Sequence, residues 1–166
     1  MTGRIAHPPD NPRTTARHRR GLSLFELGMT LAIMGVIAAI AMPRYAGAIS
    51  RYRVDLAARR IAADLAMAQN RARVTGSTRT VTFTPKTATY VLASVADFKT
   101  VGSDYTVKLS ESPYQAAINS VDLGSDGVIV FNGYGYPDSG GSIVVSSGSN
   151  QKTVAVNATT GGVTIQ

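Results

Sequence analysis

The feature that most constrains this chain is a stretch of 21 residues, Leu22–Met42, in which Glu26 is the only charged residue. As an α-helix this stretch would be about 31 Å long, enough to cross the hydrocarbon core of a bilayer. Its uncharged part, Leu27–Met42, has 16 residues and is slightly short for a span by itself. We therefore expect a membrane-spanning helix with an ionisable side chain close to one end.

The residues before this stretch favour one orientation in the membrane. Residues 1–21 hold five arginines against Asp10, with Pro and Thr and few apolar residues, a composition typical of disordered segments. Basic residues that flank a span tend to stay in the cytoplasm. The sequence thus predicts a cytoplasmic N-terminus and a C-terminal body on the other side of the membrane.

Beyond Pro43, which we expect to bend or interrupt the helix, the sequence keeps a helical period to about Val74, and Gly76 is a plausible end. The predicted apolar side of this second half carries Tyr45, Ile49, Tyr52, Leu56, Ile61, Leu65, Ala68 and Ala72.

The opposite side is predicted to carry two charge pairs spaced i,i+4, Asp55 with Arg59 and Arg60 with Asp64. We interpret this basic side as a solvated helix surface rather than as a nucleic-acid patch.

From Thr78 onward the period of the apolar residues changes to two, which is typical of strands. Strands are predicted in residues 79–83, 89–93, 105–110, 128–131, 142–147, 153–157 and 162–166. Residues 97–104 and 110–120 are expected to be longer connections. The predicted fold is α+β: a long N-terminal helix, membrane-spanning in its first half and amphipathic in its second, packed on an antiparallel β-rich C-terminal body of one or two sheets.

The residue types argue against catalysis. The chain has no cysteine, which excludes disulfides and thiolate zinc sites, and its two histidines, His7 and His18, lie in the N-terminal tail. Without that tail, neither a Ser-His nor a Cys-His nucleophile pair could form. We expect no enzyme activity, no cofactor, no metal and no small-molecule substrate.

Two constellations in the body were weighed as sites. Asp122, Asp126 and Asp138 lack the alternating ligands of a calcium-binding loop and are better explained as turn residues. Tyr134 and Tyr136 could stack on single-stranded nucleic acid, but that loop has no interleaved Lys or Arg, which favours packing or a partner contact.

The segment "RRGLSLFELGMTLAIMGVIAAIAMPRY" closely resembles the processing and methylation signal of type IV pilins and type II secretion pseudopilins. The resemblance implies cleavage between Gly21, the last leader residue, and Leu22, which would be N-methylated. Leu22 stands where most members have Phe. Glu26 then occupies the fifth mature position, and Gly35 and Pro43 match the family's internal Gly and its Pro.

In that family the carboxylate at the position of Glu26 pairs with the new α-ammonium group of a neighbouring subunit during filament assembly. A low-dielectric helix bundle would strengthen such a pair. Gly35 and Pro43 are either tolerated helix residues or positions that allow local unwinding during assembly.

Later segments are similar to the H-type pseudopilins and the related FimT minor pilins. They are "LAARRIAADLAMAQNRARVTGSTRTVTF", "GVIVFNGYGYPDSGG" and "VAVNATTGGVTIQ". The DNA-uptake branch usually has arginines in the terminal motif, where this chain has Gly162 and Thr164. Binding of nucleic acid is therefore not expected there.

The resemblance implies four parts: a cleaved leader (residues 1–21), a transmembrane assembly helix (22–43), an amphipathic helix entering the periplasm (44–76) and a β-rich head (77–166). It implies a minor type II secretion pseudopilin in the bacterial inner membrane. Its partners would be other pseudopilins at a filament tip, the prepilin peptidase and the inner-membrane assembly platform.

Two other functions stay open. One is a minor type IV pilin that serves pilus assembly or DNA uptake. The more distant one is a soluble secreted protein, because Ala39-Ile40-Ala41 ends an apolar core that follows a basic region, as in ordinary signal peptides cleaved after Ala41.

Overall fold

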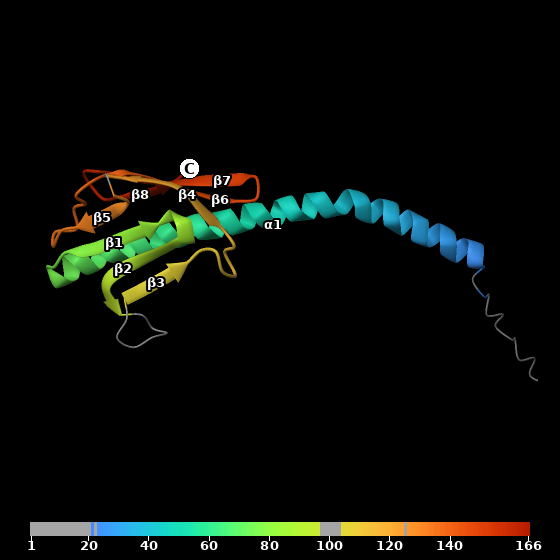
Figure 1. The fold of residues 1–166 in the computed structure, drawn as a ribbon, viewed down its shortest axis with the longest axis horizontal. Helices are drawn as coiled ribbons and strands as arrows, with labels where there is room; N and C mark the ends of the chain where they lie inside the picture. The colour runs from blue at the N-terminus through green and yellow to red at the C-terminus, as the bar shows by residue number, and fades with distance from the viewer. Residues whose placement is uncertain (1–20, 22, 97–103, 125) are drawn as a thin grey trace, which may run out of the picture. The chain divides into compact units, whose positions relative to one another are not determined.

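The computed structural model describes residues 21, 23–96, 104–124 and 126–166. The chain divides into two compact units, residues 1–40 and 41–166, and each is described separately below. The described elements are one long helix and two four-stranded sheets with every strand pair antiparallel (Figure 1).

The helix α1 spans Leu24–Thr75, so it continues through Pro43. It ends where the sequence predicts, because Gly76 has a φ of +60°, a conformation that a residue with a Cβ rarely adopts. The predicted helix end is therefore confirmed.

The strands form two sheets. The first has the order β3-β2-β1-β5, and the second has the order β4-β6-β7-β8. Their bounds are β1 Arg79–Thr84, β2 Thr89–Ala96, β3 Asp104–Lys108, β4 Ala117–Leu123, β5 Val128–Phe131, β6 Gly141–Ser147, β7 Asn150–Val156 and β8 Val163–Ile165. A short 3₁₀ helix, η1 (Pro85–Thr87), connects β1 to β2.

Both sheets cover the C-terminal half of α1, which supplies one side of the core (Figure 1). The buried apolar helix residues are Val54, Ala57, Ala58, Ile61, Leu65, Ala68 and Ala72. Alanines predominate in this set, and their small side chains let the strands approach the helix closely. The largest strand residues buried against them include Tyr90, Leu92, Ile129, Phe131 and Ile143.

The α+β prediction is confirmed, and all seven predicted strands are present as β1, β2, β3, β5, β6, β7 and β8. The prediction of a connection over residues 110–120 is wrong at its end, because β4 begins at Ala117. The ladder of β4 with β6 shifts register between Ile118 and Ser120, so a bulge breaks the two-residue period there. Of the other predicted connection, residues 97–103 lie outside the described residues, and Asp104 begins β3.

Two expectations about the faces of α1 are also wrong. Tyr45 and Tyr52, placed on the apolar side, are 71% and 68% exposed. Asp64, placed on the solvated side, is only 5% exposed. The predicted Ile61, Leu65, Ala68 and Ala72 are buried, so this part of the predicted face is confirmed. Before Ile61 the buried residues are Val54, Ala57 and Ala58, so only there is the buried face rotated about the helix axis relative to the predicted one.

Candidate processing and assembly site

The start of α1 has a defined cap. Ser23 precedes the first helical residue, and its Oγ accepts a 3.3 Å hydrogen bond from the backbone N–H of Phe25. The Ser23 carbonyl oxygen accepts the first helical bond, 3.0 Å from the N–H of Leu27. A serine in this position stabilises a helix start by accepting from otherwise unpaired N–H groups.

Gly21 lies just before this cap, outside the helix and exposed, with no atom within 4 Å of the place where a Cβ would stand. Leu22, the predicted new N-terminus, lies outside the described residues. A peptidase acting on the carbonyl of Gly21 would therefore meet an uncrowded backbone at that residue.

Glu26 occupies the first turn of α1 and is exposed. Among the described residues it forms no salt bridge. A carboxylate in the first turn interacts favourably with the helix dipole, and one without an ion partner is free to receive a cation from outside. The sequence motif includes Glu26 as a candidate assembly residue, and the structure shows that it is exposed.

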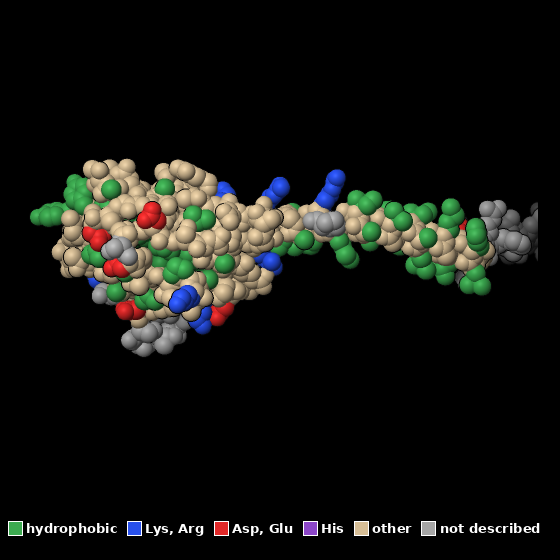
Figure 2. Space-filling model, turned by 45° about the horizontal axis from the view of Figure 1, so that its top comes forward, with side chains coloured by type: hydrophobic (Ala, Val, Ile, Leu, Met, Phe, Trp, Pro, Cys, Tyr) green, Lys and Arg blue, Asp and Glu red, His purple; other side chains and the backbone are tan. Residues whose placement is uncertain are grey.

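The first part of α1 exposes its apolar side chains on the faces seen in Figure 2. The large exposed residues of this part are Leu24, Phe25, Leu27, Met29, Leu31, Ile33, Met34, Val36, Ile37, Ile40 and Met42. By length and composition α1 could cross a membrane, since its most apolar window has a mean hydropathy of 2.1 and none of that window is buried. So large an apolar surface requires lipid or other helices to cover it.

Gly35 and Pro43 lie within the helix, and neither interrupts it. A Cβ added at Gly35 would meet no atom within 4 Å, so packing inside this chain does not require glycine there. A role for either residue in unwinding during assembly stays a prediction.

In the body, α1 is tied to both sheets by polar side chains. Gln69 Nε2 donates to the carbonyl oxygens of Gly135 at 2.8 Å and Thr160 at 2.7 Å. Arg73 Nε donates to the carbonyl oxygen of Tyr134 at 3.2 Å. These bonds fix the loop after β5 and the hairpin between β7 and β8 against the last turns of the helix.

Tyr134 is 81% exposed and Tyr136 is 54% exposed. Sequence reasoning treated their loop as free of basic residues, yet the fold places Arg73 against it from a distant part of the chain. A contact over 61 residues leaves no local signal in the sequence, so this neighbour could not have been found there.

A buried cluster joins α1 to the first sheet. Asp64 Oδ2 accepts hydrogen bonds from Tyr90 Oη at 2.6 Å and from Arg60 Nε at 3.0 Å. The guanidinium of Arg60 lies 5.7 Å from the ring centre of Tyr105. Burial raises the pKa of Asp64, while the bonds from Tyr90 and Arg60 oppose that rise. None of the buried side-chain polar atoms of this cluster lacks a hydrogen-bond partner, so its role is to hold α1 against the first sheet.

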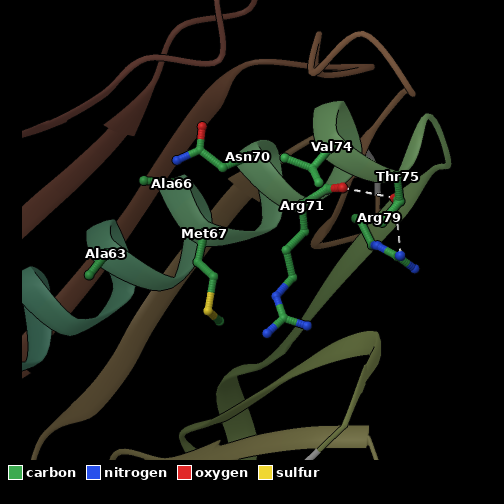
Figure 3. Close-up of a pocket in the computed structure, with 8 residues that line it drawn as sticks. All are labelled: Ala63, Ala66, Met67, Asn70, Arg71, Val74, Thr75 and Arg79. Carbon is green, nitrogen blue, oxygen red and sulfur yellow. Dashed lines mark hydrogen bonds between the residues drawn. The ribbon is translucent and has the colours of Figure 1, made fainter.

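A groove of about 580 Å³ runs along one face of α1 beside the start of β1 (Figure 3). Its lining residues are Ala63, Ala66, Met67, Asn70, Arg71, Val74, Thr75 and Arg79. Arg79 Nη2 donates to Thr75 Oγ1 at 3.2 Å, whereas Arg79 Nε is buried without a hydrogen-bond partner among the described residues. Sequence reasoning did not identify this groove, because small and polar residues on a helix face look like an ordinary solvated surface.

Two of the three aspartates considered for calcium accept hydrogen bonds from backbone N–H groups near them. Asp126 Oδ1 accepts from the N–H of Val128 at 3.2 Å, and Asp138 Oδ1 accepts from the N–H of Val130 at 3.0 Å. Within the described ranges, no three His, Cys, Asp or Glu side chains come together in a way that could hold a metal.

Comparison with known proteins identifies the family. Residues 57–161, more than half of the chain, match the family model described as "Type II transport protein GspH". A comparison with curated proteins found no match. Among solved structures, the chain is similar to the type IV minor pilin FimU of Pseudomonas aeruginosa, with 9% identity, 70% of this chain and 90% of that chain covered, and a TM-score of 0.49. The family match includes the second half of α1 and nearly all of both sheets, and by it the chain belongs to the GspH family of pilin-like proteins.

Proposed function

We propose that this chain is a minor pseudopilin of a type II secretion system. It would assemble through the first half of α1 into a periplasmic pseudopilus that drives protein export. The observation that carries the proposal is the pairing of a GspH-family body with an apolar helix whose first turn holds an accessible, unpaired Glu26. Such a subunit works by packing and recognition rather than by catalysis.

Processing would create the partner of Glu26. Prepilin peptidase would cut after Gly21, and the new α-ammonium group of Leu22, N-methylated, would stand one helical turn before Glu26. In a filament, the ammonium group of one subunit would pair with the Glu26 carboxylate of its neighbour. Because the surrounding helices exclude water, this pair would be strong enough to select the axial register between subunits.

The precursor would be a single-pass protein of the bacterial inner membrane. Its parts would be a cytoplasmic leader (residues 1–21), a transmembrane assembly helix (22–43), and an amphipathic helix (44–76) with a β-rich head (77–166) in the periplasm. The arginines of the leader support this orientation. Gly35 and Pro43 would let the helix unwind locally as it leaves the bilayer. The partners would be other pseudopilins, the peptidase and the inner-membrane assembly platform, with no cofactor.

The test of processing is the intact mass of the protein after expression with prepilin peptidase. A start at Leu22, with or without the mass of one methyl group, is the expected result. A start at Met42 would instead show ordinary secretory cleavage after Ala41 and would overturn the proposal.

The test of assembly is the substitution Glu26→Ala. The variant should be cleaved normally but should be lost from filaments recovered with the other subunits. Glu111→Ala is the matched control, because Glu111 is an exposed acid of the head that pairs with Lys108. Normal incorporation of the Glu26 variant would contradict the register role. Deletion of the gene tests which machine uses the subunit. Loss of secretion would support a type II secretion system, whereas loss of pili or of DNA uptake would support a minor type IV pilin.

A further inference from the structure

Directly after the apolar stretch, one face of α1 carries two arginines and two tyrosines: Arg44, Tyr45, Arg51 and Tyr52, here called the Arg–Tyr face. The two arginines are seven residues apart, close to two helical turns, and so are the two tyrosines. Arg51 therefore lies above Arg44 on the helix surface, and Tyr52 lies above Tyr45. Both arginines are exposed, and so are both tyrosine rings. Figure 2 shows basic side chains standing out from the helix here.

Around Arg51 and Tyr52, other positions of the helix turn toward the body. Ile49, Ser50 and Val54 are half-buried or buried. Ser50 Oγ would lie 3.0 Å from a Cβ at Gly148, in the turn between β6 and β7. The body therefore covers one side of this stretch of helix and leaves the Arg–Tyr face uncovered.

The positive charge of this face is not neutralised by the described part of the chain. No acidic residue occurs between Glu26 and Asp55. Asp55 is already engaged, by Arg59 at 2.7 Å and Lys152 at 3.1 Å. Neither Arg44 nor Arg51 forms a salt bridge with a described carboxylate. The face thus offers two free guanidinium groups to an anionic partner.

Counting along the helix places this face at a membrane surface. If Glu26 marks the inner edge of a hydrocarbon core about 30 Å thick, the outer edge falls about 20 residues later, near Ala46. Residues 45–50 are uncharged, so the bilayer can accommodate this placement. Arg44 would then lie at the edge, where a long side chain extends to the headgroups, and Arg51 about 8 Å beyond the edge.

We propose that the Arg–Tyr face binds anionic phospholipid headgroups of the outer leaflet and thereby fixes the depth of the unassembled subunit in the membrane. The proposal rests on the membrane-spanning role proposed above. Guanidinium groups bind phosphate through paired hydrogen bonds, and tyrosine rings favour the boundary between hydrocarbon and water. The same residues would have to leave the lipid before the subunit joins a filament, so anionic lipid would oppose extraction.

A depth measurement on the full chain tests this. Because the chain has no cysteine, Ala48→Cys gives a single site for a spin label between the two Arg–Tyr pairs. The labelled protein is placed in nanodiscs of phosphatidylcholine, with or without phosphatidylglycerol, and its exposure to a water-soluble nickel complex is measured. Phosphatidylglycerol should lower that exposure at least twofold, and Arg44→Gln/Arg51→Gln should abolish the effect. Lys86→Gln/Lys108→Gln removes the same charge from exposed positions of the body and should keep it.

Each other outcome rejects a specific claim. If the label is equally exposed in both lipids, or if the Arg44/Arg51 variant behaves like the original, lipid binding by this face is overturned. The same holds if the label becomes protected only on addition of partner pseudopilins, since an acidic protein surface would then be the ligand. A chain that fails to float with vesicles of either lipid overturns the membrane-spanning role itself, and this proposal with it.

Discussion

The hydroxyl group of Tyr90 donates a 2.6 Å hydrogen bond to the buried carboxylate of Asp64 and so joins β2 to the C-terminal half of α1. Tyr90 is 1% exposed, and burial together with the neighbouring carboxylate raises its pKa, so it stays a donor throughout the physiological range. The C-terminal half of α1 is thus fixed to the first sheet by a short bond between two buried side chains.

Tyr90→Phe should destabilise the body by about 1–3 kcal/mol, because it removes a donor from a buried carboxylate that keeps only Arg60. Urea unfolding of residues 45–166 at neutral pH measures the change. Tyr134→Phe is the matched control, since that ring is exposed, and its effect should stay within about 0.5 kcal/mol. Equal stability of both variants would show that the bond contributes nothing.

We expect Asp55 to make a pH-dependent contribution to the stability of the folded body. Hydrogen bonds from Arg59 and Lys152 lower the pKa of Asp55 in the folded state below its usual 3.8. Its stabilising effect is therefore complete above pH 3.8 and is lost as the pH falls through the lowered value. Asp55→Asn should cost at most about 1 kcal/mol at pH 7, as expected for a partly exposed pair, and almost nothing at about pH 2. Urea midpoints at the two pH values check this, and an equal cost at both would contradict it.

For Asp64 the folded pKa is raised by burial, so the folded state binds the proton more tightly than the unfolded chain does. Stability should consequently fall as the pH rises from about 3.8 through the raised pKa. Asp64→Asn should flatten this part of the stability curve, whereas Asp126→Asn, at an exposed turn, should leave its slope unchanged. A variant curve parallel to that of the original protein would contradict the assignment.

Gly161→Ala should destabilise the body by about 1–3 kcal/mol. Gly161 has a φ of +70°, and a Cβ there would collide with Gln69 Nε2, which donates two hydrogen bonds. Gly162→Ala is the control, because the nearest atom to its Cβ is a Thr160 hydroxyl at 3.2 Å, which can rotate away. Thermal unfolding of both variants should show a much larger loss for Gly161, and similar losses would contradict this account.

The soluble body should not bind DNA at low-micromolar concentration in a salt-sensitive manner. The terminal hairpin carries the uncharged Gly162 and Thr164, and Arg73 already donates to the backbone at Tyr134. A gel-shift series at increasing salt concentration measures this. Tight binding that weakens with salt, and is lost in Arg73→Ala, would instead favour the DNA-uptake function.

The fold was largely predictable because its elements have clear periods in the sequence. The change from a helical period to a period of two near Thr78 coincides with the end of α1, and Gly76 marks the helix end. The strand β4 was not predictable in this way. Its bulge puts Ile118 and Val121 three residues apart, and an alternating pattern cannot include both.

The candidate assembly site stays a prediction from motif spacing, whereas the contacts inside the body are seen in the structure and could not be predicted from the sequence. Asp64 and Arg60 have the spacing of a surface ion pair, and only the neighbouring strand, which brings Tyr90, shows that the pair is internal. Tyr45 and Tyr52 fit an apolar period but lie where the body does not reach. The sequence of a long helix alone therefore does not predict which of its sides a sheet from a distant part of the chain will bury.

The bond from Gln69 to the carbonyl oxygen of Thr160 joins residues that are 91 positions apart in the chain. At a synthesis rate of about 5–20 residues per second, Thr160 is added roughly 5 to 20 s after Gln69. Throughout that interval α1 has been made as far as Gln69, while the hairpin that holds its last turns does not yet exist. During synthesis, the contact between the helix and the hairpin therefore forms only after nearly the whole chain has been made, and until then the last turns of α1 lack the partner that holds them.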